Sequence, residues 1–469
     1  METDNQTKTP PITIQHRIPK GRKDSSENGP YRPRRPENSG YYQCVEDHFE
    51  DFERVYEERF ERAYGFYRPY LRSVIYRYLD CGILRNGFAR VRCAECGHEY
   101  LLAFSCKRRH FCPSCHQKRV VEFGEWVCGK VLKKVPHRHF VFSIPKILRR
   151  YFLYDRSLLS ELSRCAWEAL RVFFQEVVPQ GDGVTGAVIA IQTFGDFWGF
   201  NPHCHILCTD GCFDGKGLFR VAPRFNPEDL KAIFEHHVFR MLLGKGKITQ
   251  DLVLMLRSWR HSGFQVFVGS RILPGEEEAM EKLARYVIRA SFSQERMTSL
   301  PEESKVIYES KDAQKEKVFD ALEWMAAMSS HVPDKGEQMV RYYGYYSNVS
   351  RGKRKKRNQD EWIPCILEPE GSSKEYRKNW ARLIQKIYEI DPLTCPKCQG
   401  QMRILAFIED EEVIEKILKH LGLWDSKARP PPKVKAPSET IYLDDSESQD
   451  LPSDSFYAHP DYPMDSYLS

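Results

Sequence analysis

Two short cysteine pairs constrain the fold of the first quarter of this chain more than any other feature. Within each pair two residues separate the cysteines, so a tight turn can direct both sulfurs toward one metal ion. Fifteen residues lie between the pairs, enough for a hairpin that brings them together. We predict that one structural zinc is bound by Cys93, Cys96, Cys112 and Cys115. The alternative is four unrelated buried thiols, and Cys106, His98 or His110 could replace one ligand.

The length and charge of the chain indicate several domains and an anionic partner. A chain of 469 residues is too long for one compact domain and predicts two or three. The net charge is +6, but residues 438–469 contain eight acidic residues and no lysine or arginine, which leaves +14 on residues 1–437. A body this basic favours a polyanionic partner, of which nucleic acid is the commonest.

Cysteine usage and hydropathy indicate the compartment. Fifteen cysteines, in a long chain whose N-terminus has no apolar signal region, predict reduced thiols rather than disulfides. No stretch approaches the roughly 18 apolar residues that cross a bilayer. We therefore expect a soluble, intracellular protein without a membrane partner. Self-association is left open.

Hydrophobic periodicity predicts an α+β fold. Helical patterns cover residues 48–78, 155–178, 227–243, 276–291, 375–390 and 411–421, and strand patterns cover 136–144, 186–194, 203–208 and 265–268. The second and third strands are joined by a polar turn that suggests a hairpin. Strands and helices mingle without regular alternation, which favours an antiparallel sheet with helices packed on it. The predicted parts are a disordered polar N-terminus at 1–45, a helical and zinc-binding part at 46–130, the α+β core at 131–345, a basic linker and C-terminal extension at 346–425, and a disordered acidic tail at 426–469.

Two histidines lie two residues apart on the third predicted strand. His203 and His205 therefore point to one face, and Cys204 points to the other, into the core. Two imidazoles side by side can hold a divalent ion that polarises a phosphodiester. Such a pair is more often structural when nothing else accompanies it.

A tyrosine on a helix about eighty residues downstream supplies that context. Tyr286 is flanked by Arg285 and Arg289, and its phenol could attack a phosphate while an arginine balances the charge on the transferred group. The alternative is a half-buried core tyrosine whose hydroxyl is hydrogen-bonded.

Several motifs, in one order from about Cys81 to about Leu421, resemble the rolling-circle insertion-sequence transposases of the HUH nuclease superfamily, the group with an N-terminal zinc-binding module. They are the cysteine pairs with Ser105-Cys106-Lys107 and Phe111-Cys112-Pro113-Ser114-Cys115, residues 135–146, Gln192-Thr193-Phe194-Gly195, Asn201-Pro202-His203-Cys204-His205, Ala284-Arg285-Tyr286 with Ser291-Phe292-Ser293, and Val340-Arg341-Tyr342-Tyr343-Gly344.

The resemblance implies an enzyme that nicks one DNA strand at the end of its element. His203 and His205 would bind Mg²⁺ or Mn²⁺, and Tyr286 would be the nucleophile that forms a 5′-phosphotyrosine link and leaves a free 3′-OH. A later 3′-OH could reverse the attack and join strands without ATP.

One departure from the family pattern concerns the number of tyrosines. Many members carry two tyrosines four residues apart on this helix, whereas Lys282 stands four residues before Tyr286 here. The chain resembles the single-tyrosine branch, and strand transfer would reuse Tyr286, use a second subunit or employ another nucleophile. The candidate for the third metal ligand is Gln192, on the strand expected to pair with the histidine strand.

Basic residues in two places are candidates for contact with DNA phosphates. They are Lys107, Arg108, Arg109, Lys118 and Arg119 near the cysteines, and Arg354, Lys355 and Lys356 after an aromatic run. The alternative is solvated charge, and the aromatic residues can equally be core. Cys395 and Cys398 have zinc-knuckle spacing but no second pair after them. Either distant residues complete a site or the segment is a vestigial turn, and we favour the vestigial turn.

Two other functions share some of these features. A replication initiator or relaxase uses the same metal and tyrosine chemistry, but does not usually carry such a cysteine module. A non-catalytic zinc-containing DNA-binding protein would bind DNA without cutting it.

Overall fold

The computed structural model describes residues 36–424 apart from 109, 179–182, 196, 198, 215–217, 311–313 and 357–392. The N-terminal segment expected to be disordered is therefore almost entirely outside the described residues, and so are the acidic tail and the helix expected at 375–390. Within the described part, no helix combines the length and the apolar composition needed to cross a membrane.

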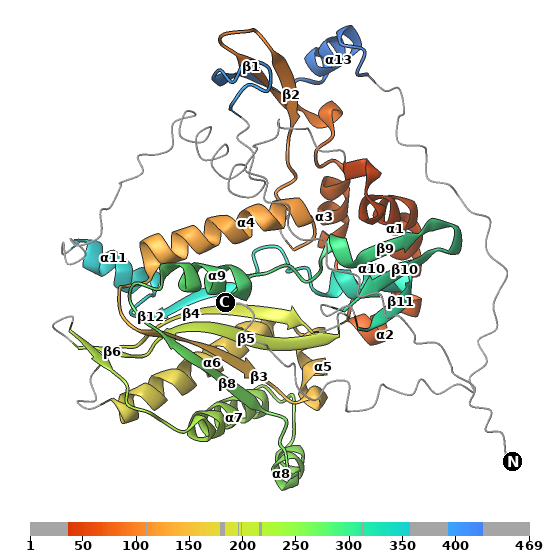
Figure 1. Cartoon of the computed structure of the whole chain (residues 1–469). Helices are drawn as coiled ribbons and strands as arrows, with labels where there is room; N and C mark the ends of the chain where they lie inside the picture. The colour runs from red at the N-terminus through yellow and green to blue at the C-terminus, as the bar shows by residue number, and fades with distance from the viewer. Residues whose placement is uncertain are drawn as a thin grey trace, which may run out of the picture.

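A five-stranded antiparallel sheet forms the centre of the molecule (Figure 1). Its strands, in spatial order, are β12 (Val340–Gly344), β4 (Gly186–Phe194), β5 (Phe200–Thr209), β3 (His137–Ser143) and β8 (Gln265–Ile272). The predicted hairpin is confirmed as β4 and β5, where Gln192 lies opposite His203. The α+β prediction is also confirmed, because every strand pair in this sheet is antiparallel.

The two faces of the sheet pack against different helices. One face packs on α5 (Lys146–Tyr154), α6 (Ser157–Val177), α7 (Pro227–Gly244) and α8 (Gln250–Ser258). Cys204 and Ile206 of β5 point into this core, as predicted. The opposite face carries Leu207, which packs with side chains of α4 (Pro113–Trp126) and α9 (Glu277–Val287). The alternation of β5 thus directs the two histidines toward α4 and α9.

A second core joins segments far apart in the sequence. It combines α1 (Gly40–Arg59), α2 (Glu61–Tyr64) and α3 (Tyr70–Leu79) with α10 (Ala321–Ser330) and a small sheet of β9 (Met297–Leu300), β10 (Lys305–Glu309) and β11 (Glu316–Asp320). Trp324 of α10 is fully buried against Tyr41 of α1, with ring centroids 5.4 Å apart. Residues 297–330 therefore pack on the N-terminal helices, and the expected boundary near residue 130 does not separate two cores.

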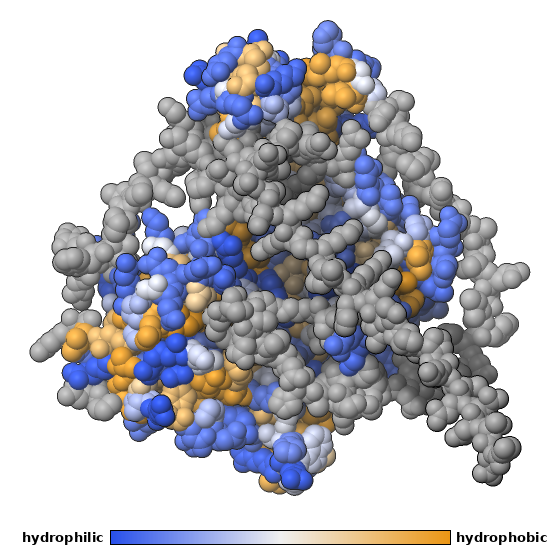
Figure 2. Space-filling view, viewed as in Figure 1, coloured by the Kyte–Doolittle hydropathy of each residue, from blue (hydrophilic) through white to orange (hydrophobic). Residues whose placement is uncertain are grey.

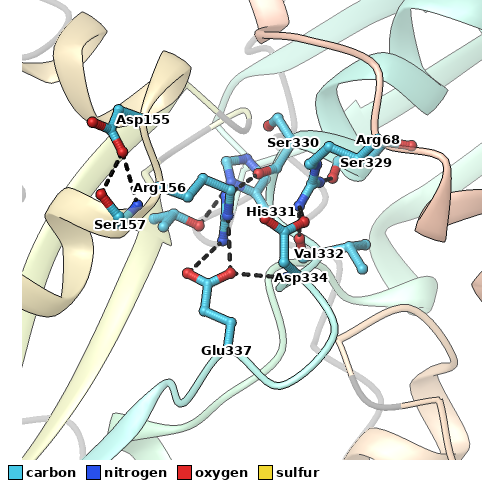
Figure 3. A network of polar contacts seen from close by, with 11 residues as sticks. Arg68, Asp155, Arg156, Ser157, Ser329, Ser330, His331, Val332, Asp334 and Glu337 are labelled. Atoms are coloured by element: carbon cyan, nitrogen blue, oxygen red, sulfur yellow. Dashed lines mark hydrogen bonds and ion pairs between the residues drawn. The ribbon is translucent and has the colours of Figure 1, made fainter.

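Two half-buried arginines connect the N-terminal helices with the α5–α6 junction and the end of α10 (Figure 3). Arg68 donates to a carboxylate oxygen of Asp334 at 2.9 Å and to the carbonyl oxygens of Ser329 and Val332. Arg156 donates to the carbonyl of Ser330 and forms an ion pair with Glu337 at 3.0 Å. Burial lowers the pKa of Arg68, and the Asp334 carboxylate opposes that shift. The network fixes the segment after α10 against two other parts of the molecule.

The C-terminal segment returns to the N-terminal part. Strand β13 (Met402–Ile408) pairs with β1 (Phe88–Cys93), which also pairs with β2 (Glu99–Ala103), and α13 (Glu411–His420) follows it. Figure 1 shows these elements together at the top of the view, red-orange strands beside blue segments. The remaining elements are the short hairpin of β6 (Gly211–Phe213) and β7 (Phe219–Val221), and α11 (Asn348–Lys356) after β12.

Candidate active site and metal centres

The two predicted histidines meet on β5. The Nε2 atoms of His203 and His205 lie 3.2 Å apart, and both side chains are buried. Two nitrogens that each bind one ion at about 2.1 Å are separated by roughly 3 Å, so this spacing fits a shared metal.

Hydrogen bonds on the far sides of the rings favour the tautomers that bind metal. His203 Nδ1 lies 2.7 Å from the carbonyl oxygen of Asn201, to which it can only donate, and this leaves the Nε2 lone pair free. His205 Nδ1 lies 3.0 Å from His139 Nε2. When His205 Nδ1 donates in that contact, its Nε2 lone pair faces that of His203, and a cation between them relieves the repulsion.

Burial keeps these imidazoles neutral. It lowers the pKa of His203 to about 4, a shift opposed by the Asn201 carbonyl and assisted by Arg289 and Arg149. Burial, and then His203, His139 and Arg289, lower the pKa of His205 well below its usual value. Neutral imidazole is the form that binds a metal ion.

Gln192 supplies an oxygen at the same place. It lies opposite His203 in the β4–β5 register, and its Nε2 donates to the carbonyl of Val287 at 2.8 Å. Its Oε1 is buried without a hydrogen-bond partner. Among the described residues, no cluster of three or more His, Cys, Asp or Glu ligands includes the two histidines. A buried acceptor beside an imidazole pair suits a divalent cation, because such an acceptor otherwise loses its hydration without compensation.

Tyr286 stands against the histidine pair from α9. Its ring centroid lies 5.5 Å from that of His205, at an interplanar angle of 85°. Arg289 covers the tyrosine ring, with its guanidinium carbon 4.8 Å from the centroid, and its Nε is buried without a hydrogen-bond partner. Arg285 points elsewhere, since it pairs with Glu281 and contacts the position of Gly124 on α4. The two arginines predicted around the tyrosine therefore occupy different environments.

The end of α9 is held by two side chains from other elements. The helix was expected to continue to Ser291, but it ends at Val287. Gln192 binds the carbonyl of Val287, and His116 Nε2 donates to the carbonyl of Ile288 at 2.8 Å. His116 Nδ1 accepts from the backbone N–H of His110 at 3.1 Å, which fixes the tautomer that donates to Ile288. These contacts position the turn that carries Tyr286.

Four cysteines gather at the start of α4. They are Cys81, Cys106, Cys112 and Cys115, whose sulfurs all lie within 4.8 Å of one another. The Cys106 and Cys115 sulfurs are 3.6 Å apart, and Cys81 lies 3.8 Å from Cys112. Four sulfurs that each bind zinc at 2.3 Å are separated by roughly 3.8 Å, so the group fits a tetrahedral zinc site.

A second four-cysteine group lies on the β13–β1–β2 sheet. It consists of Cys93, Cys96, Cys395 and Cys398, again with all sulfurs within 4.8 Å. The prediction that Cys93, Cys96, Cys112 and Cys115 share one ion is therefore wrong in its grouping, because the two pairs belong to different groups. The interpretation of Cys395 and Cys398 as a vestigial turn is also wrong, because Cys93 and Cys96 complete their group.

The residues predicted to contact DNA have different environments. Lys107 is exposed, and Arg108 and Lys118 are half-buried along a cleft between the N-terminal helices and the β13–β1–β2 sheet. Arg119 lies over the ring of Phe123, and Arg109 is outside the described residues. Lys355 and Lys356 are exposed.

Arg354 does not have the exposure that a DNA contact requires. It is buried, donates to the carbonyl of Tyr345 at 2.8 Å, and stacks on the ring of that tyrosine at 3.8 Å. Tyr346 is also buried, and its hydroxyl lies 2.8 Å from His137 Nε2. The aromatic run therefore includes core residues, and the prediction for Arg354 is wrong because its guanidinium is used inside the fold.

Comparisons with known proteins agree with this architecture. The family model described as "Transposase zinc-binding domain" matches residues 48–144, and the one described as "Putative transposase" matches 186–354. The transposase for insertion sequence element IS801 of Pseudomonas savastanoi pv. phaseolicola is 24% identical over 72% of this chain and 83% of its own length. A Sinorhizobium fredii protein named "Putative transposase y4qJ" is 24% identical over 71% of this chain and 87% of its own length. No solved structure matches the chain.

The two matched models describe a transposase and a transposase zinc-binding domain, and each covers less than half of this chain. The chain is therefore similar to insertion-sequence transposases that carry an N-terminal zinc-binding domain. The matched regions contain the histidine pair, Tyr286 and the first four-cysteine group, whereas Cys395 and Cys398 lie outside both.

Proposed function

We propose that this transposase nicks and rejoins single-stranded DNA at the ends of its element through attack by Tyr286. One observation carries the proposal: the Tyr286 ring stands 5.5 Å from the ring of His205, whose Nε2 lies 3.2 Å from that of His203. The imidazole pair comes from β5, whereas the phenol and the Arg289 guanidinium come from the end of α9 and the turn after it. A nucleophile next to a cation site is the arrangement that phosphoryl transfer requires.

The cleavage step balances without water or ATP. The Tyr286 hydroxyl oxygen forms a bond to phosphorus while the bond from phosphorus to the 3′ oxygen breaks. The departing 3′ oxygen takes up a proton, the phenol loses one, and the products are a 5′-phosphotyrosine link and a free 3′-OH. In the rejoining step a 3′-OH attacks the same phosphorus and the phenol is regenerated. The number of phosphoester bonds stays constant, so the reaction is reversible.

His203, His205 and Gln192 are the residues that would hold Mg²⁺ or Mn²⁺. When bound, the ion would supply Lewis-acid polarisation of the scissile phosphate. In the tautomer proposed here, His205 Nδ1 donates to His139 Nε2 at 3.0 Å, which directs the His205 Nε2 lone pair into the site. Cys204 on the reverse side of β5 anchors the strand in the core, where burial raises the pKa of its thiol and keeps it protonated.

Arg289 is the residue proposed to receive the phosphate charge. Two observations support this: its Nε is buried without a hydrogen-bond partner, and its guanidinium lies over the ring of the proposed nucleophile. Arg149 of α5 is a second candidate from the opposite side, because its charge acts on His203. The sequence pattern did not indicate Arg149, since it lies on a helix without a recognisable motif.

Helix α9 offers one tyrosine for the two steps of this proposal. Helix α9 contains one tyrosine, and Lys282, at the position of the second tyrosine in many relatives, is exposed and pairs with Glu278 at 3.0 Å. Strand transfer therefore requires reuse of Tyr286, a tyrosine from a second subunit or another nucleophile. Zinc bound by the first four-cysteine group would hold the start of α4 and, through it, α9.

Covalent trapping tests this function directly. Purified protein is incubated with a labelled single-stranded oligonucleotide from the element end and Mn²⁺, and protein–DNA adducts are separated under denaturing conditions. We expect an adduct with the wild type and none with Tyr286→Phe, while Tyr342→Phe, which removes another half-buried phenol, retains it. An adduct formed by Tyr286→Phe at the wild-type rate would refute the assignment.

A further inference from the structure

We propose that Cys93, Cys96, Cys395 and Cys398 form a second structural zinc site that ties the C-terminal segment to the zinc-binding domain. The first two ligands lie inside the region matched as a zinc-binding domain, and the other two follow about 300 residues later, outside both matched regions. The Cys93 and Cys398 sulfurs are 3.5 Å apart, as are those of Cys96 and Cys395. This site is independent of the catalytic proposal.

The two cysteine turns have matching backbone geometry. In the first, the N–H of Cys93 donates to the carbonyl of His98 at 2.7 Å, and in the second, the N–H of Cys395 donates to that of Gly400 at 2.8 Å. Each turn has a left-handed residue directly after its second cysteine, Gly97 with φ 70° and Gln399 with φ 61°. A non-glycine residue rarely adopts this conformation, so the surrounding structure must enforce it.

Backbone N–H groups point at the sulfurs in both turns. The N–H of Cys96 donates to the Cys93 sulfur at 3.5 Å, and that of Gly400 donates to the Cys398 sulfur at 3.4 Å. Such bonds favour the thiolate, which is the form that binds zinc. The four sulfurs of two turns from distant parts of the chain thus converge on one point.

The strands that carry these turns have little core of their own. Cys93 and Cys395 are buried with only Val91 and Met402 in one cluster of buried residues, and a second cluster joins β1 and β2 to α13. Figure 2 shows apolar residues exposed on this end of the molecule, at the top of the view, and Leu405, Phe407, Leu421 and Leu423 are each about half exposed. So small a buried core contributes little free energy of folding, and zinc would supply what is missing.

The proposed zinc therefore cross-links the C-terminal segment to the zinc-binding domain. It fixes the register in which β13 pairs with β1, Cys93 opposite Met402. It also holds α13 and Trp424 beside the cleft that carries Lys107 and Arg108, where the Trp424 ring covers Arg85 at 4.7 Å. Loss of the ion would release the C-terminal side of that cleft and leave the central sheet unchanged.

The zinc content of the full-length protein, in ions per chain, tests the proposal. We expect two zinc ions per chain in the wild type and one in Cys395→Ser/Cys398→Ser. The control is Cys128→Ser, which removes a cysteine that belongs to neither group and should keep two zinc ions. A wild type with one zinc per chain, or a double variant that keeps two, would overturn it.

Thiol reactivity gives a second readout that needs no variant. Cys96 and Cys398 are exposed, so without a ligand they should react fast with an alkylating reagent. We expect both to be protected in the zinc-loaded wild type and to become reactive together when a chelator is added. Immediate alkylation of either thiol before chelation would contradict the proposal, as would a Cys93–Cys398 or Cys96–Cys395 disulfide in the reduced-buffer preparation. Neither readout depends on DNA cleavage, so the proposed second zinc site and the proposed cleavage by Tyr286 can be refuted separately.

Discussion

The two four-cysteine groups have the same ligand set but different relations to the rest of the chain. The first takes its ligands from residues 81–115, and two of its sulfurs are on the first turn and N-cap of α4, which packs on the helix of Tyr286. The second takes them from two turns about 300 residues apart and borders only two small buried clusters. One group is part of the support of the proposed active site, whereas the other connects distant segments.

This difference follows from where the buried surface lies. Cys112 and Cys115 are members of the large core that contains α1, α3 and α10. In the second group Cys96 and Cys398 are exposed. We expect the first group to matter for catalysis and folding together, and the second to matter mainly for the C-terminal segment.

The largest effect should separate the two groups in the trapping assay. Cys112→Ser/Cys115→Ser should abolish adduct formation, because zinc binding contributes about 10–16 kcal/mol in small zinc modules, as much as the whole stability of a typical domain. Cys395→Ser/Cys398→Ser should retain adduct formation within about fivefold on a short oligonucleotide, since a cost below about 1 kcal/mol changes a rate by no more than that. Equal losses in both variants would show that the groups do not differ in this way.

Zinc release should be biphasic. With a chelator in excess, the exposed second group should lose its ion first and the buried first group later, because access controls ligand exchange at thiolates. Zinc release is followed by a colorimetric indicator, and samples from each phase are assayed with added Mn²⁺. We expect adduct formation to survive the fast phase and to be lost in the slow phase. A single phase that removes zinc and activity together would contradict the comparison.

The same contrast explains what could be predicted from the sequence. Local patterns were sufficient for β3, β4 and β5. Strand alternation identified β3 and β5, in which the residues on the two faces differ in polarity, whereas β4 is a short apolar run that is buried on both faces. Alternation also placed His203 and His205 on one face and Cys204 on the other. Local spacing also identified both cysteine pairs, but not their partners, since the choice between Cys112 and Cys398 as a neighbour of Cys93 depends on the pairing of β1 with β13.

Residues that act through tertiary contacts were missed for a related reason. Cys81 has no cysteine at metal-binding spacing, so nothing local signals its role. His139 shares a strand face with His137, and only the β3–β5 pairing brings it to His205. The end of α9 at Val287 was missed because side chains from β4 and α4 take the carbonyls of Val287 and Ile288. Such contacts are not encoded in the periodicity of the helix itself.

His116 should transmit part of the effect of the first group to Tyr286. His116→Ala removes the donor to the Ile288 carbonyl, and an unsatisfied buried acceptor costs about 1–3 kcal/mol. We expect adduct formation at saturating oligonucleotide to slow by roughly tenfold, the equivalent of about 1.4 kcal/mol, with unchanged oligonucleotide affinity. His116→Gln, which restores a donor, should recover part of the rate, and Gln117→Ala, at the exposed neighbouring position, should have no effect. A loss of affinity without a change in rate would assign His116 to DNA binding instead.

The smallest effect is expected at Arg285, the other link between α4 and α9. Its side chain is about one-third exposed and pairs with Glu281 four residues earlier on the helix, and such pairs contribute about 0.3–0.5 kcal/mol. Arg285→Ala should therefore change the adduct rate by no more than about twofold, whereas Arg289→Ala should reduce it far more, because Arg289 covers the tyrosine ring. Single-turnover rates of adduct formation, measured for both variants and the wild type, compare the two losses. If Arg285→Ala slows the reaction as much as Arg289→Ala, the contact of Arg285 with α4 takes part in positioning Tyr286. The first cysteine group would then act on the nucleophile by a route other than His116 alone.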